Sequence, residues 1–240
     1  MLLGVMLIVA ALPSTAEATY PGENGRILFT QWAQDDGRIN LRIFSVRANG
    51  TGMRALTPRS QTSYCATGSP DGERIAFAAS GPEIDAGIWV MDADGSDSHL
   101  LVAGFTGCLT WSPHGRRIAY DIHSGIWVIN ADGASPPERI LAIRGARAPA
   151  WSPDGHRIAF TLDRRGKFSD IALVHPDGSQ PHTKVTDTAR GVEDFPEWHP
   201  SGDRLFFVLQ SGSGPDLFRF ARRPFEQVRP AFPDFEHEPV

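Results

Sequence analysis

The stretch that decides the fold is Trp-Ser-Pro-Asp-Gly-His-Arg-Ile-Ala-Phe at residues 151–160. Proline fixes the backbone angle φ and the Asp-Gly pair reverses the chain, so the stretch predicts the end of one strand, a tight turn and the start of another strand. A third apolar strand, Ile-Ala-Leu-Val, follows at residues 171–174 and leads into a second turn, Pro-Asp-Gly, at residues 176–178. This part of the chain therefore predicts antiparallel strands joined by short turns.

Five copies of this unit follow one another along the chain. Each copy carries the phrase Arg-(Ile or Leu)-x-aromatic, and successive copies are 40 to 48 residues apart. Short apolar segments such as residues 100–102 and 139–141 supply a fourth strand. A four-stranded antiparallel unit of this length is typical of one blade of a β-propeller, so we predict an all-β propeller of four-stranded antiparallel blades. The five arginines that mark the copies are Arg26, Arg74, Arg117, Arg157 and Arg204.

The repeat predicts five blades and a way of closing the ring. The first unit has almost no innermost strand of its own, so we expect a C-terminal strand, residues 236–240, to complete the first blade and remove an exposed sheet edge. The alternative is a truncated six-bladed propeller. The predicted blades are approximately residues 20–63, 64–106, 107–146, 147–192 and 193–235.

The first 18 residues have the layout of a secretory signal peptide. Residues 1–12 are almost wholly apolar, and the small residues Ala16 and Ala18 follow at the expected cleavage site. This apolar run is shorter than the roughly 20 residues that a transmembrane helix needs. We expect cleavage after Ala18, a β-propeller over residues 19–240, and a secreted or periplasmic protein with no membrane insertion after cleavage; an uncleaved anchor is the alternative.

The two cysteines occupy equivalent positions in neighbouring units. Cys65 lies four residues before Ser69, and Cys108 lies four residues before Ser112. These positions fall on innermost strands, which converge near the axis of a propeller. In an exported protein the spacing favours a Cys65–Cys108 disulfide over two reactive thiols.

Composition restricts the class of partner. The chain has 23 basic and 28 acidic residues, a net charge of −5, and therefore no positive excess that would attract nucleic acid. Its 24 glycines and 19 prolines favour many short strands and turns over a helical bundle.

Candidate binding residues lie on the predicted face whose loops vary between units. The turns within the repeat are set by backbone geometry, whereas the connections at the opposite end differ in length and charge, and binding sites are commonly built on such loops. A basic group there would suit a carboxylate or phosphate, an acidic group with a histidine would suit a cation or acid–base chemistry, and a lone tryptophan would suit ligand contact. The alternatives are solvated loops and ordinary ion pairs. The basic residues are Arg144, Arg147, Arg164, Arg165 and Lys167, the acidic group is Glu193, Asp194 and Glu197 with His237, and the tryptophan is Trp32.

The repeat resembles that of the TolB-type β-propeller family, which has WD40-like (PD) repeats. The resemblance rests on Trp-Ser-Pro-Asp-Gly-x-Arg-Ile-Ala-Phe and on the later phrase Ile-Trp-Val-x-x-Ala-Asp-Gly, and it covers the chain after the signal peptide. It implies a propeller that docks a partner protein in an envelope complex. The namesake of the family carries an α/β domain before the propeller, and we expect this chain to have the propeller only.

These features together predict a non-catalytic scaffold that binds a protein or a small ligand. The partner would be another envelope or extracellular protein, and neither nucleic acid, a catalytic residue, a metal nor a cofactor is predicted. The alternative is a channel-centred hydrolase or lyase of a propeller enzyme family, which would use a few carboxylates and histidines in the channel.

Overall fold

The computed structural model describes residues 25–35, 38–104, 106–164, 168–187, 191–211 and 214–222, and this part of the chain consists of strands, turns and loops. It contains no helix, and therefore no helical segment that is long and apolar enough to cross a membrane. The predicted signal peptide and the predicted closing strand lie outside the described residues. In chain order the strands are β1 (Ile27–Asp35), β2 (Arg38–Val46), β3 (Arg54–Ala55), β4 (Thr62–Gly68), β5 (Arg74–Gly81), β6 (Ile84–Asp92), β7 (His99–Ala103), β8 (Leu109–Trp111), β9 (Arg117–Ile122), β10 (Gly125–Asn130), β11 (Glu138–Leu141), β12 (Ala146–Trp151), β13 (Ile158–Arg164), β14 (Phe168–Val174), β15 (Thr183–Lys184), β16 (Val192–Trp198), β17 (Arg204–Ser211) and β18 (Gly214–Arg222).

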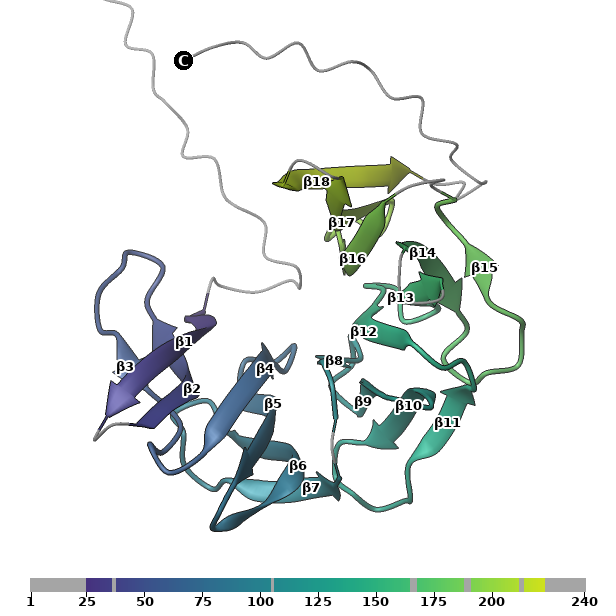
Figure 1. Cartoon of the computed structure of the whole chain (residues 1–240). Helices are drawn as coiled ribbons and strands as arrows, with labels where there is room; N and C mark the ends of the chain where they lie inside the picture. The colour runs from purple at the N-terminus through teal and green to yellow at the C-terminus, as the bar shows by residue number, and fades with distance from the viewer. Residues whose placement is uncertain are drawn as a thin grey trace, which may run out of the picture.

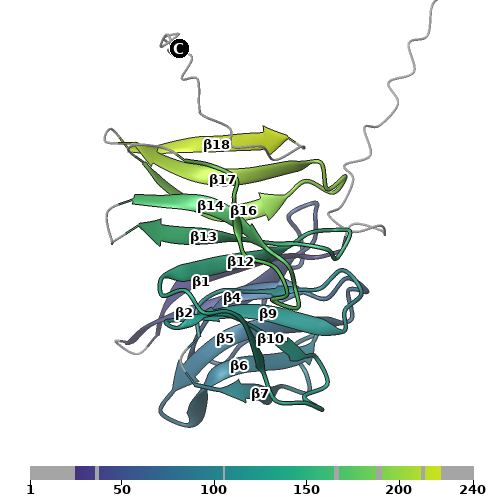
Figure 2. The ribbon, with the colours of Figure 1, turned by 90° about the vertical axis from the view of Figure 1, so that its right-hand side faces the viewer.

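The strands form antiparallel sheets arranged around a common centre, which confirms the predicted all-β propeller (Figure 1). The hydrogen-bonded orders are β1-β2-β3, β4-β5-β6-β7 and β8-β9-β10-β11, followed by one larger sheet that contains β12 to β18. Strands β4, β8, β12 and β16 lie nearest the centre, and Figure 2 shows successive sheets stacked against one another. The second and third sheets therefore each present one strand to the axis, and the larger sheet presents two.

The described residues form four sheets, whereas the sequence predicts five separate blades. Strands β12 to β15 form one meander, and β16, β17 and β18 form the next. These two meanders are counted as one seven-stranded sheet because Ser169 of β14 pairs in parallel with Val192 of β16. The Ser169 amide donates to the Gly191 carbonyl at 3.2 Å, and its hydroxyl donates to the Glu193 carbonyl at 2.6 Å. The fourth and fifth repeats are thus hydrogen-bonded to one another, which the repeat pattern did not predict.

The Ser-Pro-Asp-Gly turn is held by its own side chains. The Arg74 amide donates to the Ser69 hydroxyl at 2.9 Å, and the Glu73 amide donates to the Asp71 carboxylate at 3.0 Å. Gly72 closes the turn with a φ of +74°, a conformation that costs glycine little and other residues more. The same bonds recur in the turn that follows β12, between Arg157 and Ser152. These local bonds explain why the phrase predicts a turn from sequence alone.

Strand β5 shows how the sheets share their cores. Its residues alternate between two clusters: Ile75 and Phe77 pack with Ile43 of the first sheet, whereas Ala76 packs with Trp111 of the third sheet. Side chains of successive strand residues point to opposite faces, so a continuous apolar strand requires both faces to be buried. The apolar character of the repeat strands therefore follows from their position between neighbouring sheets.

Residues of the repeat also form the contacts between neighbouring blades. The Arg117 guanidinium lies 5.0 Å from the ring centroid of Trp151, and the Trp198 indole donates to the Ala150 carbonyl at 3.0 Å. Turn prolines also pack against the turn glycine of the following unit, since a Cβ at Gly155 would lie 3.3 Å from Pro113. The composition of the repeat thus reflects packing between blades as well as turn geometry.

Candidate functional site

Three of the four strands nearest the centre are bulged at the same position. The pairing register shifts in β4, β12 and β16, and within each shift one non-glycine residue has a positive φ: +49° at Cys65, +49° at Ala148 and +53° at Phe195. A bulge bends a strand and redirects its side chains. The bulges were not predicted from sequence, although Pro149 and Pro196 gave a signal, because proline within a sheet is confined to edges and bulges.

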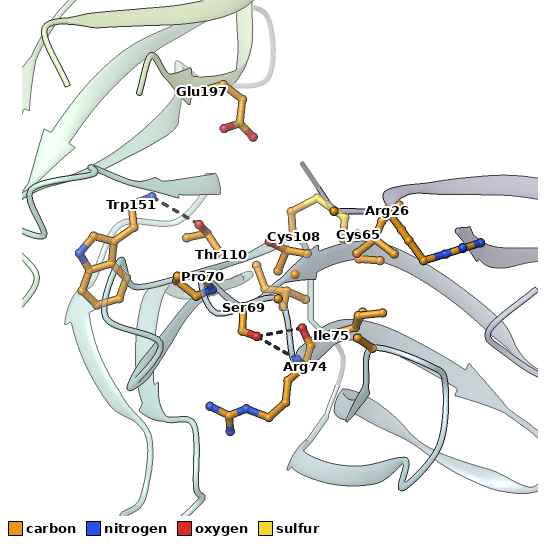
Figure 3. Close-up of a pocket in the computed structure, with 18 of the residues that line it drawn as sticks. Arg26, Cys65, Ser69, Pro70, Arg74, Ile75, Cys108, Thr110, Trp151 and Glu197 are labelled. Carbon is orange, nitrogen blue, oxygen red and sulfur yellow. Dashed lines mark hydrogen bonds between the residues drawn. A yellow bond between two sulfur atoms is a disulfide. The ribbon is translucent and has the colours of Figure 1, made fainter. Parts of the chain in front are cut away.

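The predicted disulfide is confirmed. Cys65 of β4 is bonded to Cys108, which immediately precedes β8, and their Cα atoms are 5.2 Å apart. The bond joins the innermost segments of two neighbouring sheets across a sequence separation of 43 residues. Figure 3 shows it in the wall of a central cavity, so the bond holds two sides of that wall together.

A cavity of about 1280 Å³ lies among the innermost strands. Its wall includes residues of β4, β8, β12 and β16, the turn that follows β4, the turn that follows β6, and the residues at the start of β1. It therefore reaches the end of the propeller that carries the short repeated turns. The sequence analysis had placed the candidate site at the other end, among the variable loops.

Gly68 explains part of the cavity's position. The residues at the equivalent position of the later units, directly before the turn, are Trp111, Trp151 and Trp198, and all three are buried. A Cβ at Gly68 would lie 3.8 Å from the side chain of Leu28 on β1. The seam between the first and second sheets thus lacks the indole that the other seams contain, and space remains where that indole would be.

Charged residues of both signs contribute to the wall of this cavity. Arg26, Arg54 and Arg74 line it together with Asp94 and Glu197. Glu197 points into the cavity from β16 (Figure 3). Its side chain is reached by solvent there, yet the surrounding protein raises the pKa of its carboxyl group by desolvation. Glu197 is therefore a carboxylate with increased proton affinity in a partly enclosed space.

A second polar cluster joins β9 to the innermost segments of the third and fourth repeats. Asp121 is buried and accepts hydrogen bonds from the amides of Cys108 and Ala148, both at 3.0 Å. Desolvation raises the pKa of Asp121, although these two hydrogen bonds oppose the shift. A Cβ at Gly107 would overlap the Asp121 carboxylate, so this position requires glycine. The cluster ties β9 to the neighbouring inner segments.

The predicted basic group does not form a free basic patch among the described residues. Arg144 is exposed, but Arg147 pairs with Asp194 at 2.8 Å, and Arg164 pairs with Asp170 at 3.2 Å. Arg165 and Lys167 lie outside the described residues. Two of the predicted basic side chains therefore have carboxylate partners.

The predicted acidic group is likewise divided. Glu193 is 1% exposed and its carboxylate accepts a hydrogen bond from the Thr186 hydroxyl. Asp194 accepts from Arg147 and, at 2.9 Å, from the Thr161 hydroxyl. His237 lies outside the described residues. The structure thus brings Arg147 and Asp194 together, whereas the sequence analysis placed them in separate groups.

Trp32 lies on β1 and is 65% exposed, which leaves it available for contact. Ile39, on the paired strand β2, is also exposed. Within the described ranges no group of three or more His, Cys, Asp or Glu side chains is arranged to hold a metal ion.

The sequence comparisons find relatives of the TolB type. No family model matches the chain. The chain is 32% identical over 110 residues to the protein TolB homolog of Chlorobium luteolum, covering 45% of this chain and 24% of that protein. It is 31% identical over 150 residues to an uncharacterized protein of Agrobacterium fabrum, covering 58% of this chain and 48% of that protein. The chain thus matches at most about half the length of these curated relatives.

The structural comparison agrees. The crystal structure of a putative TolB from Agrobacterium tumefaciens matches with a TM-score of 0.66 and 23% identity, covering 82% of this chain and 78% of that one. At this identity the match concerns the fold. The repeat, the sheet arrangement and these matches lead to one assignment: the described part of the chain is a TolB-like β-propeller.

Proposed function

We propose that this protein is an exported, non-catalytic scaffold that binds a protein partner of the cell envelope or the extracellular space. The observation that carries the proposal is the cavity of about 1280 Å³, which is lined by the innermost strands of the TolB-like propeller. A curated relative from Ruthia magnifica, 26% identical over 73 residues, is named Tol-Pal system protein TolB, which supports an envelope role.

Export is supported by two features of the chain. Residues 1–18 have the layout of a signal peptide. The Cys65–Cys108 disulfide suits an oxidising compartment such as the periplasm or the extracellular space, because cytosolic reductants keep most thiols reduced.

The ring is proposed to contain five blades and to close with residues 236–240. Among the described residues β1 pairs only with β2, so its inner edge lacks the strand that β4, β8, β12 and β16 provide in the later repeats. A C-terminal strand beside β1 would satisfy that edge.

Variable-loop contacts remain part of the proposal. Trp32 and Arg144 are both exposed and suit contact with a partner. Arg165, Lys167 and His237 remain predicted contacts. Arg147, Arg164, Glu193 and Asp194 would contribute mainly by holding the loops in place, since the described contacts occupy them.

The second candidate function is a channel-centred hydrolase or lyase. The raised pKa of Glu197, which desolvation causes, suits a general acid. Turnover of a polysaccharide or oligosaccharide that is lost in Glu197→Gln, with the fold retained, would favour this candidate over the scaffold.

The test compares partner recovery from envelope extract by the purified chain and by two tryptophan variants. Gly68→Trp would place in the cavity the indole that the other seams carry, whereas Gln180→Trp adds the same side chain at an exposed turn. We expect one partner to be recovered with the wild type and with Gln180→Trp and lost with Gly68→Trp. Equal recovery of the partner by a folded Gly68→Trp variant would exclude the cavity as the binding site. If the wild type recovers no reproducible partner, the proposed scaffold function is wrong.

A further inference from the structure

The first repeat differs from the second and the third in the contact that its repeat arginine makes. Arg74 and Arg117 each stack on the tryptophan of the next unit, Trp111 and Trp151. Arg26 holds the same place in the first unit, but the residue at the tryptophan position of the next unit is Gly68. The Arg26 guanidinium lies against its own sheet, where it contacts Ser45 of β2.

The Arg26 guanidinium lies near the guanidinium groups of Arg54 and Arg47. Arg26 donates through Nε to the Ser45 hydroxyl at 2.9 Å and through Nη2 to the carbonyls of Ser45 and Gly52. Arg54 also donates to the Ser45 hydroxyl, at 3.4 Å. A Cβ at Gly52 would lie 2.7 Å from Arg47 Nη1 and 3.8 Å from Arg26 Nη1, so the third guanidinium is adjacent. We name Arg26, Arg47 and Arg54 the arginine triad.

Among the described residues, the positive charge of the triad is not balanced by direct ion pairs. Within the part of the chain that the structure describes, no carboxylate lies within ion-pair distance of the three guanidinium groups. Desolvation, and then the charges of Arg54 and Arg47, lower the pKa of Arg26. Asp94 accepts hydrogen bonds from the Ser96 hydroxyl and amide, and these bonds, together with the charge of Arg54, lower the pKa of Asp94. This one carboxylate therefore offsets part of the positive charge of the three arginines. Like charges gathered in this way favour an anionic ligand.

The triad borders the central cavity. Arg26 and Arg54 are part of its wall, together with the apolar residues Leu28 and Ile75; Figure 3 labels Arg26 and Ile75. The volume of about 1280 Å³ exceeds the roughly 300–1000 Å³ typical of sites for small molecules, so an extended segment fits better than a single ion. The net charge of −5 disfavours a long polyanion, which would meet repulsion beyond the triad.

We propose that the arginine triad is a carboxylate-recognition site, and that it binds an acidic segment of the partner protein whose apolar side chains enter the cavity. The proposal rests on the scaffold function proposed above and names the chemistry of the partner. Guanidinium groups bind carboxylates through paired N–H donors, so aspartate and glutamate side chains suit the site.

The test uses the full chain and a short synthetic peptide in which Asp and Glu alternate with Leu and Phe. The variant is Arg47→Glu, because the Arg47 side chain is exposed. The matched control is Arg116→Glu, an equal change of charge at another exposed position. We expect Arg47→Glu to weaken binding about tenfold or more, Arg116→Glu to change it less than about twofold, and the Asn/Gln version of the peptide to bind more weakly than the acidic one.

Four results would overturn the proposal. These are equal binding of the acidic peptide by Arg47→Glu and the wild type, equal binding of the acidic and amide peptides, binding of inorganic phosphate as tight as that of the peptide, and tighter binding of heparin. Circular dichroism verifies that each variant is folded. Recovery of the partner from extract distinguishes the two proposals. If Gly68→Trp abolishes recovery but Arg47→Glu does not, the scaffold function is retained and the arginine triad is excluded as the recognition site.

Discussion

The guanidinium of Arg74 lies 4.8 Å from the ring centroid of Trp111 and joins the second sheet to the third. The indole in turn donates to the Thr67 carbonyl at 3.1 Å, so one tryptophan is bound from two sides. The same contact recurs between Arg117 and Trp151, so it links two pairs of successive repeats. It is missing where Gly68 stands at the tryptophan position, and the cavity lies there.

Trp111→Ala is expected to lower the free energy of unfolding by about 3–5 kcal/mol, because Trp111 is 1% exposed and the substitution leaves a large void. Arg74→Ala is expected to cost about 1 kcal/mol through the lost cation–π contact. Denaturant unfolding of both single variants and the double variant measures the coupling. Strictly additive losses would mean that the stacking contributes nothing to stability.

Removing the disulfide is expected to destabilise the chain by about 3–4 kcal/mol, since the bond restricts a 43-residue separation in the unfolded chain. Thermal melting with and without reductant measures the change in Tm for the wild type. The Cys65→Ser/Cys108→Ser variant is the control, because its Tm should not respond to reductant. An unchanged Tm of the fully reduced wild type would contradict the prediction.

Asp121→Asn is expected to change how stability depends on pH. Since desolvation raises the folded-state pKa of Asp121 above 3.8, the folded state holds this proton more tightly than the unfolded state. The stability that protonation provides is therefore present at pH values below about 3.8 and is lost as the pH rises through the folded-state pKa. The wild type should lose stability relative to Asp121→Asn as the pH rises above about 3.8, as measured by urea unfolding at a series of pH values. A stability difference that stays constant with pH would contradict the prediction.

Arg147→Ala and Arg144→Ala are expected to differ although both residues belong to the same predicted basic group. Arg147 pairs with Asp194, whose side chain is 13% exposed, so its removal leaves a largely buried carboxylate without its cation and should cost about 1–2 kcal/mol. Arg144 is exposed and its removal should change stability by less than about 0.5 kcal/mol. Denaturant unfolding compares the two, and equal effects would mean that the pair is not stabilising.

Deletion of residues 236–240 is expected to lower the Tm, because the proposed closing strand would no longer cover the inner edge of β1. Replacing the same five residues by a Gly-Ser sequence of equal length controls for chain length and should lower the Tm as well. A Tm unchanged by both alterations would exclude ring closure by this segment.

Several features could be predicted from the sequence because they depend on residues that are close together in the chain. The Ser69, Asp71 and Arg74 hydrogen bonds lie within one turn, so the turn phrase predicted the β4–β5 connection directly. The equivalent positions of Cys65 and Cys108 relative to their turns predicted the disulfide, since repeats place equivalent residues at the same depth.

The sequence alone determined the repeat, its turns and the all-β architecture, because strand alternation and turn chemistry act over a few neighbouring residues. Only the tertiary structure decided that Arg147 pairs with Asp194, 47 residues away, and that Ser169 pairs with Val192 so that two repeats share one sheet. It also decided that Gly68, Leu28, Arg26 and Arg54 line one cavity. These contacts join separate sheets, and their geometry depends on how the sheets pack around the axis, which no local pattern of residues encodes.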